Sequence, residues 1–228
     1  MKTYSIPFLF NKKERRETME YIKKPVQIEM NSMEIIESEL TTEINDPKKL
    51  AVVKRVIHTT ADFEYADLLE FSDDAIDVAI NELKNGAWIY SDTSMIISGV
   101  NKRNLSLFGG QVINFVHDHD VFDEAAIRGV TRSMVSIEKG AKDSRVSIFA
   151  IGNAPTAIFK LKEMIEEGKI EKPKLIIGVP VGFVGAAESK DLVPDLKVPY
   201  IIVRGRKGGS PVAAAIINAI LLMAKEDL

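Results

Sequence analysis

The chain has 228 residues, of which 46% are hydrophobic and 28% are charged, so its composition is that of a folded globular protein. Its 30 Lys and Arg residues against 33 Asp and Glu residues give a formal net charge of −3, which argues against a broad basic face for nucleic acid. The sequence contains no cysteine, which excludes disulfides, cysteine-based zinc sites and thiol nucleophiles. An anionic ligand must therefore be bound by local positive groups.

The sequence predicts neither a membrane span nor a cleavable secretory signal. The longest apolar run, residues 213–224, is too short to cross a bilayer and is interrupted by Asn218. At the N-terminus, Lys2 is followed by a short mixed stretch and then by the charged run 12–16, which is unlike a signal peptide. We therefore expect a cytoplasmic protein that binds neither membranes nor nucleic acid.

Residues 1–24 are expected to be an N-terminal extension, because a short apolar stretch and a highly charged run precede Pro25. Residues 25–228 are expected to form one domain, since no repeat, low-complexity stretch or linker interrupts them. Hydrophobic spacing and capping residues predict the elements of this domain. Helices are expected over 26–40, from about 46–47, from a cap at 72–74 to Gly86, over 121–139, over 155–167, and from Ser210 as the N-cap of the last helix. Strands are expected over 87–90, 111–116, 145–151, 174–179 and 199–203.

This alternation of short, continuously apolar strands with amphipathic helices predicts the α/β class. The expected architecture is a three-layer α/β/α domain with a mostly parallel, doubly wound sheet. In such a sheet, ligands bind beyond the carboxyl ends of the strands. The segments that follow the strands are therefore the place to search for function.

Four segments, residues 91–103, 152–156, 180–190 and 204–210, follow predicted strands and should meet at that edge. Three of them are rich in small residues and two carry cations; glycine lets backbone N–H groups approach a ligand, and helix N-termini favour anions. A single loop of this kind more often serves only to form a turn. Four of them at one edge of the sheet favour a pocket for a large polyanionic small molecule. The glycine spacing fits neither a dinucleotide fingerprint nor a P-loop, so a nucleotide site is the weaker alternative.

Among single residues, His58 is the most informative. It lies at the end of an amphipathic helix, one turn after Arg55, and an imidazole can deliver or accept a proton near neutral pH. The alternative interpretation is a helix-terminal histidine bonded to a carbonyl oxygen. A Ser–His–Asp hydrolase is not supported, because the sequence has no Gly-x-Ser-x-Gly elbow.

His117 and His119 alternate with Asp118 and Asp120, a pattern that first looks like a metal site. Alternating ligands reach one cation only if the loop folds back on itself. We interpret this segment as a solvated strand-to-helix turn in which Asp120 caps the next helix. No metal ligand is predicted.

Five motifs resemble those of the precorrin-8X methylmutase family, which includes the cobalt-precorrin-8 methylmutases. They are RVIHTT at residues 55–60, DTSM at 92–95, GNAPTA at 152–157, GVPVGFVGAAESK at 178–190 and RGRKGGS at 204–210. The likeness runs from about residue 25 to the C-terminus, and the last two motifs are long enough to be highly specific. His117 and His119 are not part of the family pattern.

This resemblance implies an isomerase of corrin-ring (cobalamin) biosynthesis. The implied reaction moves a methyl group from C-11 to C-12 of precorrin-8X or cobalt-precorrin-8, giving hydrogenobyrinic or cobyrinic acid, without a redox step or a cofactor. The resemblance also implies a homodimer with its sites near the subunit interface. His58 falls on the family histidine that protonates the tetrapyrrole. Ser32 matches a family serine near the ring, and Arg132 matches a family arginine suited to substrate carboxylates.

A corrinoid precursor is a flat apolar disc edged with acetate and propionate arms, so it requires an apolar floor, scattered cations and backbone donors. With His58 as the catalytic residue, the predicted substrate-binding residues are Ser32, Thr59, Asp92, Thr93, Ser94, Met95, Arg132, Asn153, Ala154, Gly182, Phe183, Arg206, Lys207 and Gly208. A non-catalytic tetrapyrrole-binding or carrier protein and a Rossmann-like nucleotide-binding enzyme are the alternative hypotheses. Both the cobalt-loaded and the metal-free substrate are compatible with the sequence.

Overall fold

A six-stranded sheet forms the centre of the computed structural model, which describes residues 24–226. Its strand order is β1-β6-β5-β4-β2-β3; β2 to β6 run parallel, and β1 pairs antiparallel with β6 at one edge. The strands are β1 (Leu69–Phe71), β2 (Trp88–Ser91), β3 (Val112–Ile113), β4 (Val146–Ile151), β5 (Leu175–Gly178) and β6 (Tyr200–Val203). The predicted extension lies almost wholly outside the described residues, and the domain boundary at residue 25 stays a prediction.

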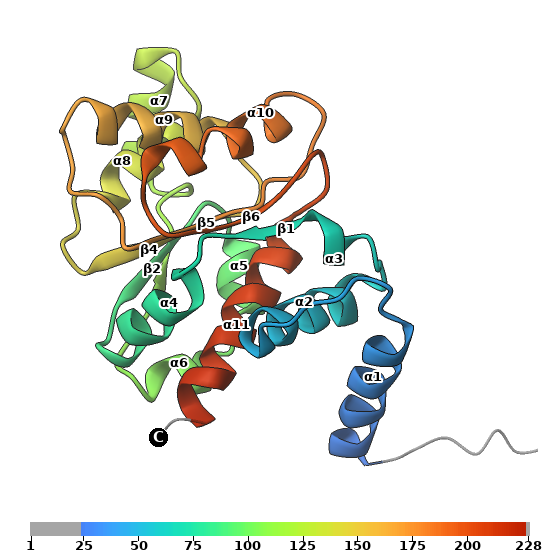
Figure 1. Ribbon diagram of the computed structural model, residues 1–228. Coiled ribbons are helices and arrows are strands. Elements are labelled where there is room, and N and C mark those ends of the chain that lie inside the picture. The colour runs from blue at the N-terminus through green and yellow to red at the C-terminus, as the bar shows by residue number, and fades with distance from the viewer. Residues whose placement is uncertain (1–23, 227–228) are drawn as a thin grey trace, which may run out of the picture.

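Helices cover both faces of the sheet, which confirms the predicted three-layer architecture (Figure 1). One layer contains α2 (Pro47–Thr60), α4 (Ala75–Lys84), α5 (Ser94–Gly99), α6 (Lys102–Ser106) and α11 (Ser210–Glu226). The other contains α7 (His119–Arg128), α8 (Arg132–Gly140), α9 (Pro155–Glu166), α10 (Ala186–Asp191) and the short 3-10 helix Pro194–Leu196. Helix α1 (Pro25–Glu39) packs on α2 and projects from the body, and the single turn α3 (Tyr65–Leu68) leads into β1 (Figure 1).

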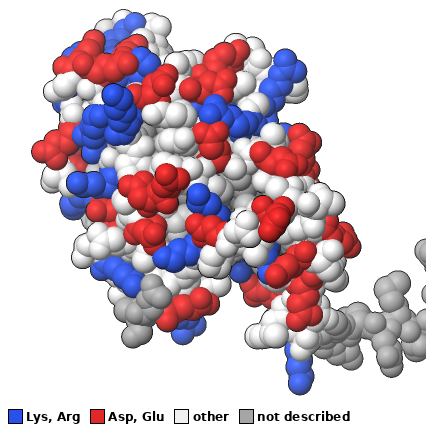
Figure 2. All heavy atoms as spheres, in the orientation of Figure 1, with Lys and Arg blue, Asp and Glu red and all other residues white. Residues whose placement is uncertain are grey.

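Burial on both sides explains why the strands are continuously apolar. Along β4, Ile148 and Ala150 enter one core cluster while Phe149 and Ile151 enter the other, because successive side chains of a strand alternate between its faces. Helix α11 packs against α2, α4 and α5 in the first of these clusters and is buried over most of its length. Among residues 24–226, no helix combines the length and apolar character that a membrane crossing needs. On the face drawn in Figure 2, acidic and basic side chains are intermingled.

Four features of the fold differ from the sequence-based expectations. The strand expected over 111–116 is confined to Val112–Ile113. The helix expected over 121–139 is wrong: it is divided into α7 and α8, because Gly129 adopts a left-handed conformation (φ 63°) and Thr131 then caps α8 by accepting a hydrogen bond from the backbone N–H of Met134. The edge strand β1 and the short helices α5, α6 and α10 were not expected. Asp120 does not cap α7; the N-cap position belongs to Asp118, whose side chain makes no capping bond.

The direction of the chain across the sheet reverses between β2 and β4. From β2 the chain passes to β3 on one side and then returns to β4 on the other side, which makes the carboxyl ends of β2 and β4 the switch point of the doubly wound sheet. The four segments that follow the parallel strands do meet at this edge. The Gly182 N–H donates to the Arg206 carbonyl (3.1 Å), and the Gly209 N–H donates to the Val179 carbonyl (2.7 Å).

Two glycines of the turn after β6 provide a test of this packing. Gly205 and Gly208 both have positive φ angles, 73° and 145°, but a Cβ at Gly208 would overlap the Val179 carbonyl oxygen, whereas a Cβ at Gly205 would meet no atom within 4 Å. Gly205→Ala should therefore lower the free energy of unfolding by about 1–2 kcal/mol through backbone strain alone. Gly208→Ala should cost about 2 kcal/mol more, because the backbone of Val179 cannot move aside. Urea unfolding measures both losses, and equal losses would contradict the packing.

Candidate active site

A buried carboxylate organises the switch point. Asp92 follows β2 and is only 3% exposed. Its Oδ1 accepts the N–H of Gly152 (2.9 Å), and its Oδ2 accepts the N–H groups of Asn153 (2.8 Å) and Ala154 (2.6 Å). Burial raises the pKa of Asp92, and the backbone donors oppose that shift. This carboxylate is engaged by three backbone donors, so Asp92 holds the turn before α9, which includes the buried Ala154.

A hollow of about 340 Å³, which we call the switch-point hollow, opens beside this junction. It brings together five of the predicted substrate-binding residues from three separate segments. Its lining residues are Asp92, Thr93, Ser94, Val116, His117, Thr131, Arg132, Ser133 and Asn153. Arg132, the first residue of α8, is exposed and forms no ion pair with another described residue. The hollow therefore offers one unpaired guanidinium and several hydroxyl groups.

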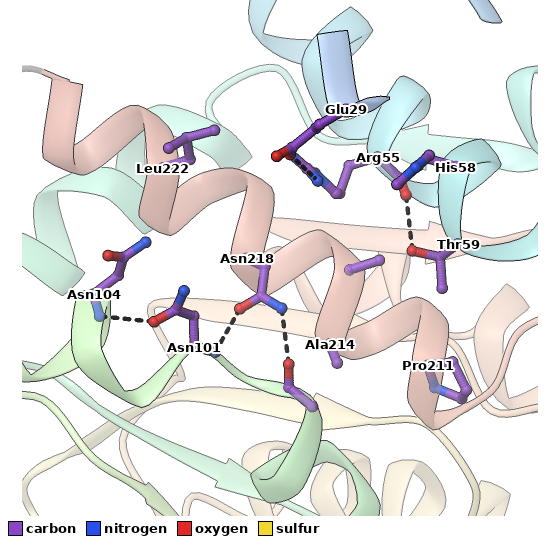
Figure 3. A pocket seen from close by; sticks show the side chains of 12 residues that line it. Glu29, Arg55, His58, Thr59, Asn101, Asn104, Pro211, Ala214, Asn218 and Leu222 are labelled. Atoms are coloured by element: carbon purple, nitrogen blue, oxygen red, sulfur yellow. Dashed lines mark hydrogen bonds and ion pairs between the residues drawn. The ribbon is translucent and has the colours of Figure 1, made fainter. Parts of the chain in front are cut away.

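A second and larger hollow, of about 500 Å³, lies beside His58, and we call it the His58 cavity. Figure 3 shows its walls, which come from α1, α2, the segment of α5 and α6, and α11. The lining residues are Glu29, Arg55, His58, Thr59, Gly99, Asn101, Asn104, Pro211, Ala214, Ala215, Asn218 and Leu222. His58 and Thr59 therefore line one cavity, whereas Arg132 lines the other hollow.

Within the His58 cavity, most polar side chains are engaged. Arg55 pairs with Glu29 (Nη1 to Oε1, 2.8 Å), and the Thr59 hydroxyl donates to the Arg55 carbonyl (2.9 Å) (Figure 3). Asn218 is bound through both ends of its amide: Oδ1 accepts the N–H of Asn101 (2.7 Å) and Nδ2 donates to the carbonyl of Gly99 (2.8 Å). His58 lies exposed on the last turn of α2 and has no hydrogen bond to a residue within 24–226, so the carbonyl-bonded alternative is wrong.

One hydrogen bond links the structure around the two hollows. The hydroxyls of Thr93, in the switch-point hollow, and of Ser210, next to Pro211 of the His58 cavity, lie 2.9 Å apart. Helix α5 runs from Ser94 in one hollow to Gly99 in the other, and Met95 on α5 is 60% exposed.

Other predicted residues lie apart from both hollows. Phe183 is 83% exposed at the tip of the turn after β5, with the Arg206 guanidinium 5.5 Å from its ring centre, and Gly182 adjoins them. Gly208 is held against Val179 by close packing, as described above. Ser32 donates its hydroxyl to the Ile28 carbonyl within α1 (2.8 Å) and lines neither hollow.

Lys207 connects the turn after β6 to the end of α2. Its ammonium lies 2.5 Å from the Asp62 carboxylate and 2.6 Å from the Glu64 carboxylate, and these bonds raise the pKa of Lys207. Because both acids already balance its charge, Lys207 is poorly available to a substrate carboxylate. The pair with Asp62 instead holds the segment that follows His58 close to the glycine-rich turn.

Sequence reasoning missed the role of Lys190, although the residue ends one of the family-like motifs. Lys190 lies on α10 and is fully buried, and its ammonium donates to the Lys207 carbonyl (2.8 Å). Burial lowers the pKa of Lys190 to about 8. Lysine is rarely buried without a partner, so the sequence alone favours a surface position for it.

In the segment that resembled a metal site, the acidic side chains form ion pairs with a lysine. Lys139 binds both Asp118 and Asp120 at 2.7 Å, so these acids are already paired. Within residues 24–226, no three His, Asp or Glu side chains gather in a way that would hold a metal ion. His117 lies exposed in a turn, as expected, and also lines the switch-point hollow.

Lys190 makes stability depend on pH. Its folded-state pKa of about 8 lies below the ordinary value of 10.5, so the folded protein loses this proton at a lower pH than the unfolded chain does. The free energy of unfolding should therefore gain a contribution that grows as the pH rises from about 8 to about 10.5. Lys190→Met has no such proton, so its unfolding free energy should rise less between about pH 7.5 and about pH 10. Equal changes in the two proteins, measured by urea unfolding, would exclude Lys190 as the cause.

Comparison with known proteins agrees with the motifs and the fold. The family model "Precorrin-8X methylmutase" matches residues 27–223. The cobalt-precorrin-8 methylmutase of Salmonella typhimurium is 43% identical over 217 residues, which cover 91% of this chain and all of that protein. The precorrin-8X methylmutase of Pseudomonas aeruginosa is 46% identical over 177 residues, which cover 77% of this chain and 83% of that protein. The crystal structure of the Thermus thermophilus precorrin-8X methylmutase superposes with a TM-score of 0.79 at 35% identity, covering 89% of this chain and 97% of that one. The chain belongs to the precorrin-8X methylmutase family.

Proposed function

We propose that the chain moves a methyl group from C-11 to C-12 of precorrin-8X or its cobalt complex, with His58 as the proton donor. The observation that carries this proposal is the exposed imidazole of His58, which lines a cavity of about 500 Å³. Membership of the methylmutase family supports the reaction type, an isomerisation in cobalamin biosynthesis.

In the proposed mechanism, the His58 imidazolium donates a proton to the conjugated ring. The added positive charge eases migration of the methyl group, and return of the proton to the imidazole leaves an isomer of the substrate. Three titratable side chains line the cavity, and the other two, Glu29 and Arg55, are paired with each other. A positioned acid of this kind contributes roughly 10²- to 10⁴-fold to the rate. Holding the ring in its reactive geometry supplies a further contribution.

The walls of the two hollows suit the two parts of a corrinoid. Pro211, Ala214, Ala215 and Leu222 on α11 present an apolar surface to the flat ring. Arg132, in the switch-point hollow, is suited to an acidic arm of the ring edge, because a guanidinium binds a carboxylate with two parallel hydrogen bonds. Met95, which is exposed on α5, would then lie beneath the ring.

We also propose that the active form is a homodimer. Helix α1 projects from the body (Figure 1), and several of its apolar side chains are exposed, among them Val26 (71%), Met30 (52%) and Ile35 (55%). Exposed apolar side chains on a projecting helix are typical of a surface that another chain covers. The cytoplasmic location stays a prediction.

Replacing His58 tests the proposal. His58→Asn should lower the rate of isomerisation by about 10²- to 10⁴-fold, because the proton donor is lost, while binding of the corrinoid should change by less than about threefold. The rate is followed as the change of the visible spectrum after mixing with cobalt-precorrin-8 or precorrin-8X, with no cofactor added.

The matched control is His119→Asn, which removes an exposed imidazole of α7 that lines neither hollow and should leave the rate unchanged. A near-normal rate in His58→Asn would refute the role of His58. Tight binding of both substrates by the unaltered protein without a spectral change would instead favour the carrier hypothesis.

A further inference from the structure

His117 lies where the sequence did not predict a functional residue. It lines the switch-point hollow together with Arg132, although it is not part of the family motifs and belongs to a segment interpreted as a solvated turn. Its neighbours in the hollow are the hydroxyl-bearing residues Thr93, Ser94 and Ser133. An imidazole beside a guanidinium and hydroxyl groups is suited to an anionic ligand.

The turn that carries His117 is held in place by specific hydrogen bonds. Asn114 donates its side-chain amide to the Ser91 carbonyl at the end of β2 (2.9 Å) and accepts the Val116 N–H (2.8 Å). The Asp118 N–H donates to the Phe115 carbonyl (3.0 Å). These hydrogen bonds attach residues 114–118 to the carboxyl end of β2, directly beside Asp92. The turn that contains His117 is therefore held in a defined position.

Within the hollow, the Arg132 guanidinium and the His117 imidazole have no acidic partner among the described residues. Asp118 and Asp120 are both bound by Lys139, and the Asp92 carboxylate accepts three backbone N–H groups. Arg132 has no acidic partner among the described residues, and it begins α8, whose N-terminus adds positive partial charge. The acids near the hollow are thus occupied, whereas its guanidinium and imidazole are not.

We infer that His117 and Arg132 together bind one carboxylate arm of the substrate, with His117 as a specificity-determining residue for that arm. This inference rests on the proposed function. A hollow of about 340 Å³ accommodates an acetate or propionate arm but not the ring. Arg132 would bind the carboxylate with two hydrogen bonds, and His117 would add a third from its ring N–H, in a geometry that an uncharged amide arm cannot match.

The test measures binding of the product, cobyrinic acid, and of forms in which a single arm is amidated, by the change of the corrinoid spectrum. His117→Gln should weaken binding of the fully acidic product by about tenfold, the effect of one hydrogen bond to a charged group. For the one amidated form that lacks the contacted carboxylate, the same substitution should change affinity by less than about twofold, because the partner is already absent. His117→Lys, which supplies another N–H donor, should recover most of the affinity.

His119→Gln, an exposed imidazole two residues away and outside both hollows, is the matched control and should bind every form as the unaltered protein does. Unchanged affinity in His117→Gln would overturn the inference. Equal weakening for all amidated forms would also overturn it, because that result indicates a purely structural role. If the unaltered protein binds no corrinoid, the proposed function fails as well; if it binds and isomerises the substrate while His117→Gln has no effect, only this inference fails.

Discussion

The site depends on one buried carboxylate, that of Asp92. It accepts three consecutive backbone N–H groups from the turn before α9 and so joins the end of β2 to the end of β4, where the strand order reverses. Gly152, the first of these donors, lies so close to Ser210 that a Cβ would come within 2.8 Å of its backbone. The Thr93 hydroxyl contacts the Ser210 hydroxyl. The segments that follow β2, β4 and β6 are distant in the sequence and meet at this junction. The loss of any one of these contacts would displace the segments that it joins.

The two hollows differ in chemistry. The His58 cavity combines an apolar wall from α11 with one unpaired titratable group, whereas the switch-point hollow has an unpaired guanidinium and hydroxyl groups. This division suits a ligand that is apolar at its centre and acidic at its edge. Holding the ring between the two would place the proposed proton donor on one side and a binding site for an arm on the other. The Lys207–Asp62 pair and the buried Lys190 add to this arrangement by fixing the turn after β6 to the helix end that carries His58.

The sequence predicted the parts of this fold that depend on local pattern. Continuous apolar runs identified the five parallel strands, and Asp46 followed by Pro47 marked the start of α2, where Asp46 does accept the backbone N–H groups of residues 48 and 49. The break at Gly129 was missed because buried Val121 and Val135 leave the apolar pattern uninterrupted across it. Edge strand β1 has only three residues, too few for a periodicity to appear. The positions of Lys190 and His117 depend on contacts with distant segments, which the local sequence pattern does not predict. His58 was found through its motif, but its separation from Gly182 and Phe183 became visible only in the structure.

The central claim is that a single corrinoid binds over α5 and the start of α11 and contacts both hollows. A crystal structure of the chain with cobyrinic acid bound tests this claim most directly. The account predicts a ring over α5 and the start of α11, with the His58 imidazole beside the ring near C-11 and C-12 and one acidic arm in the switch-point hollow at Arg132. A ring seated instead on Phe183 and Arg206, with His58 out of its reach and the switch-point hollow not contacted by any arm, would contradict it.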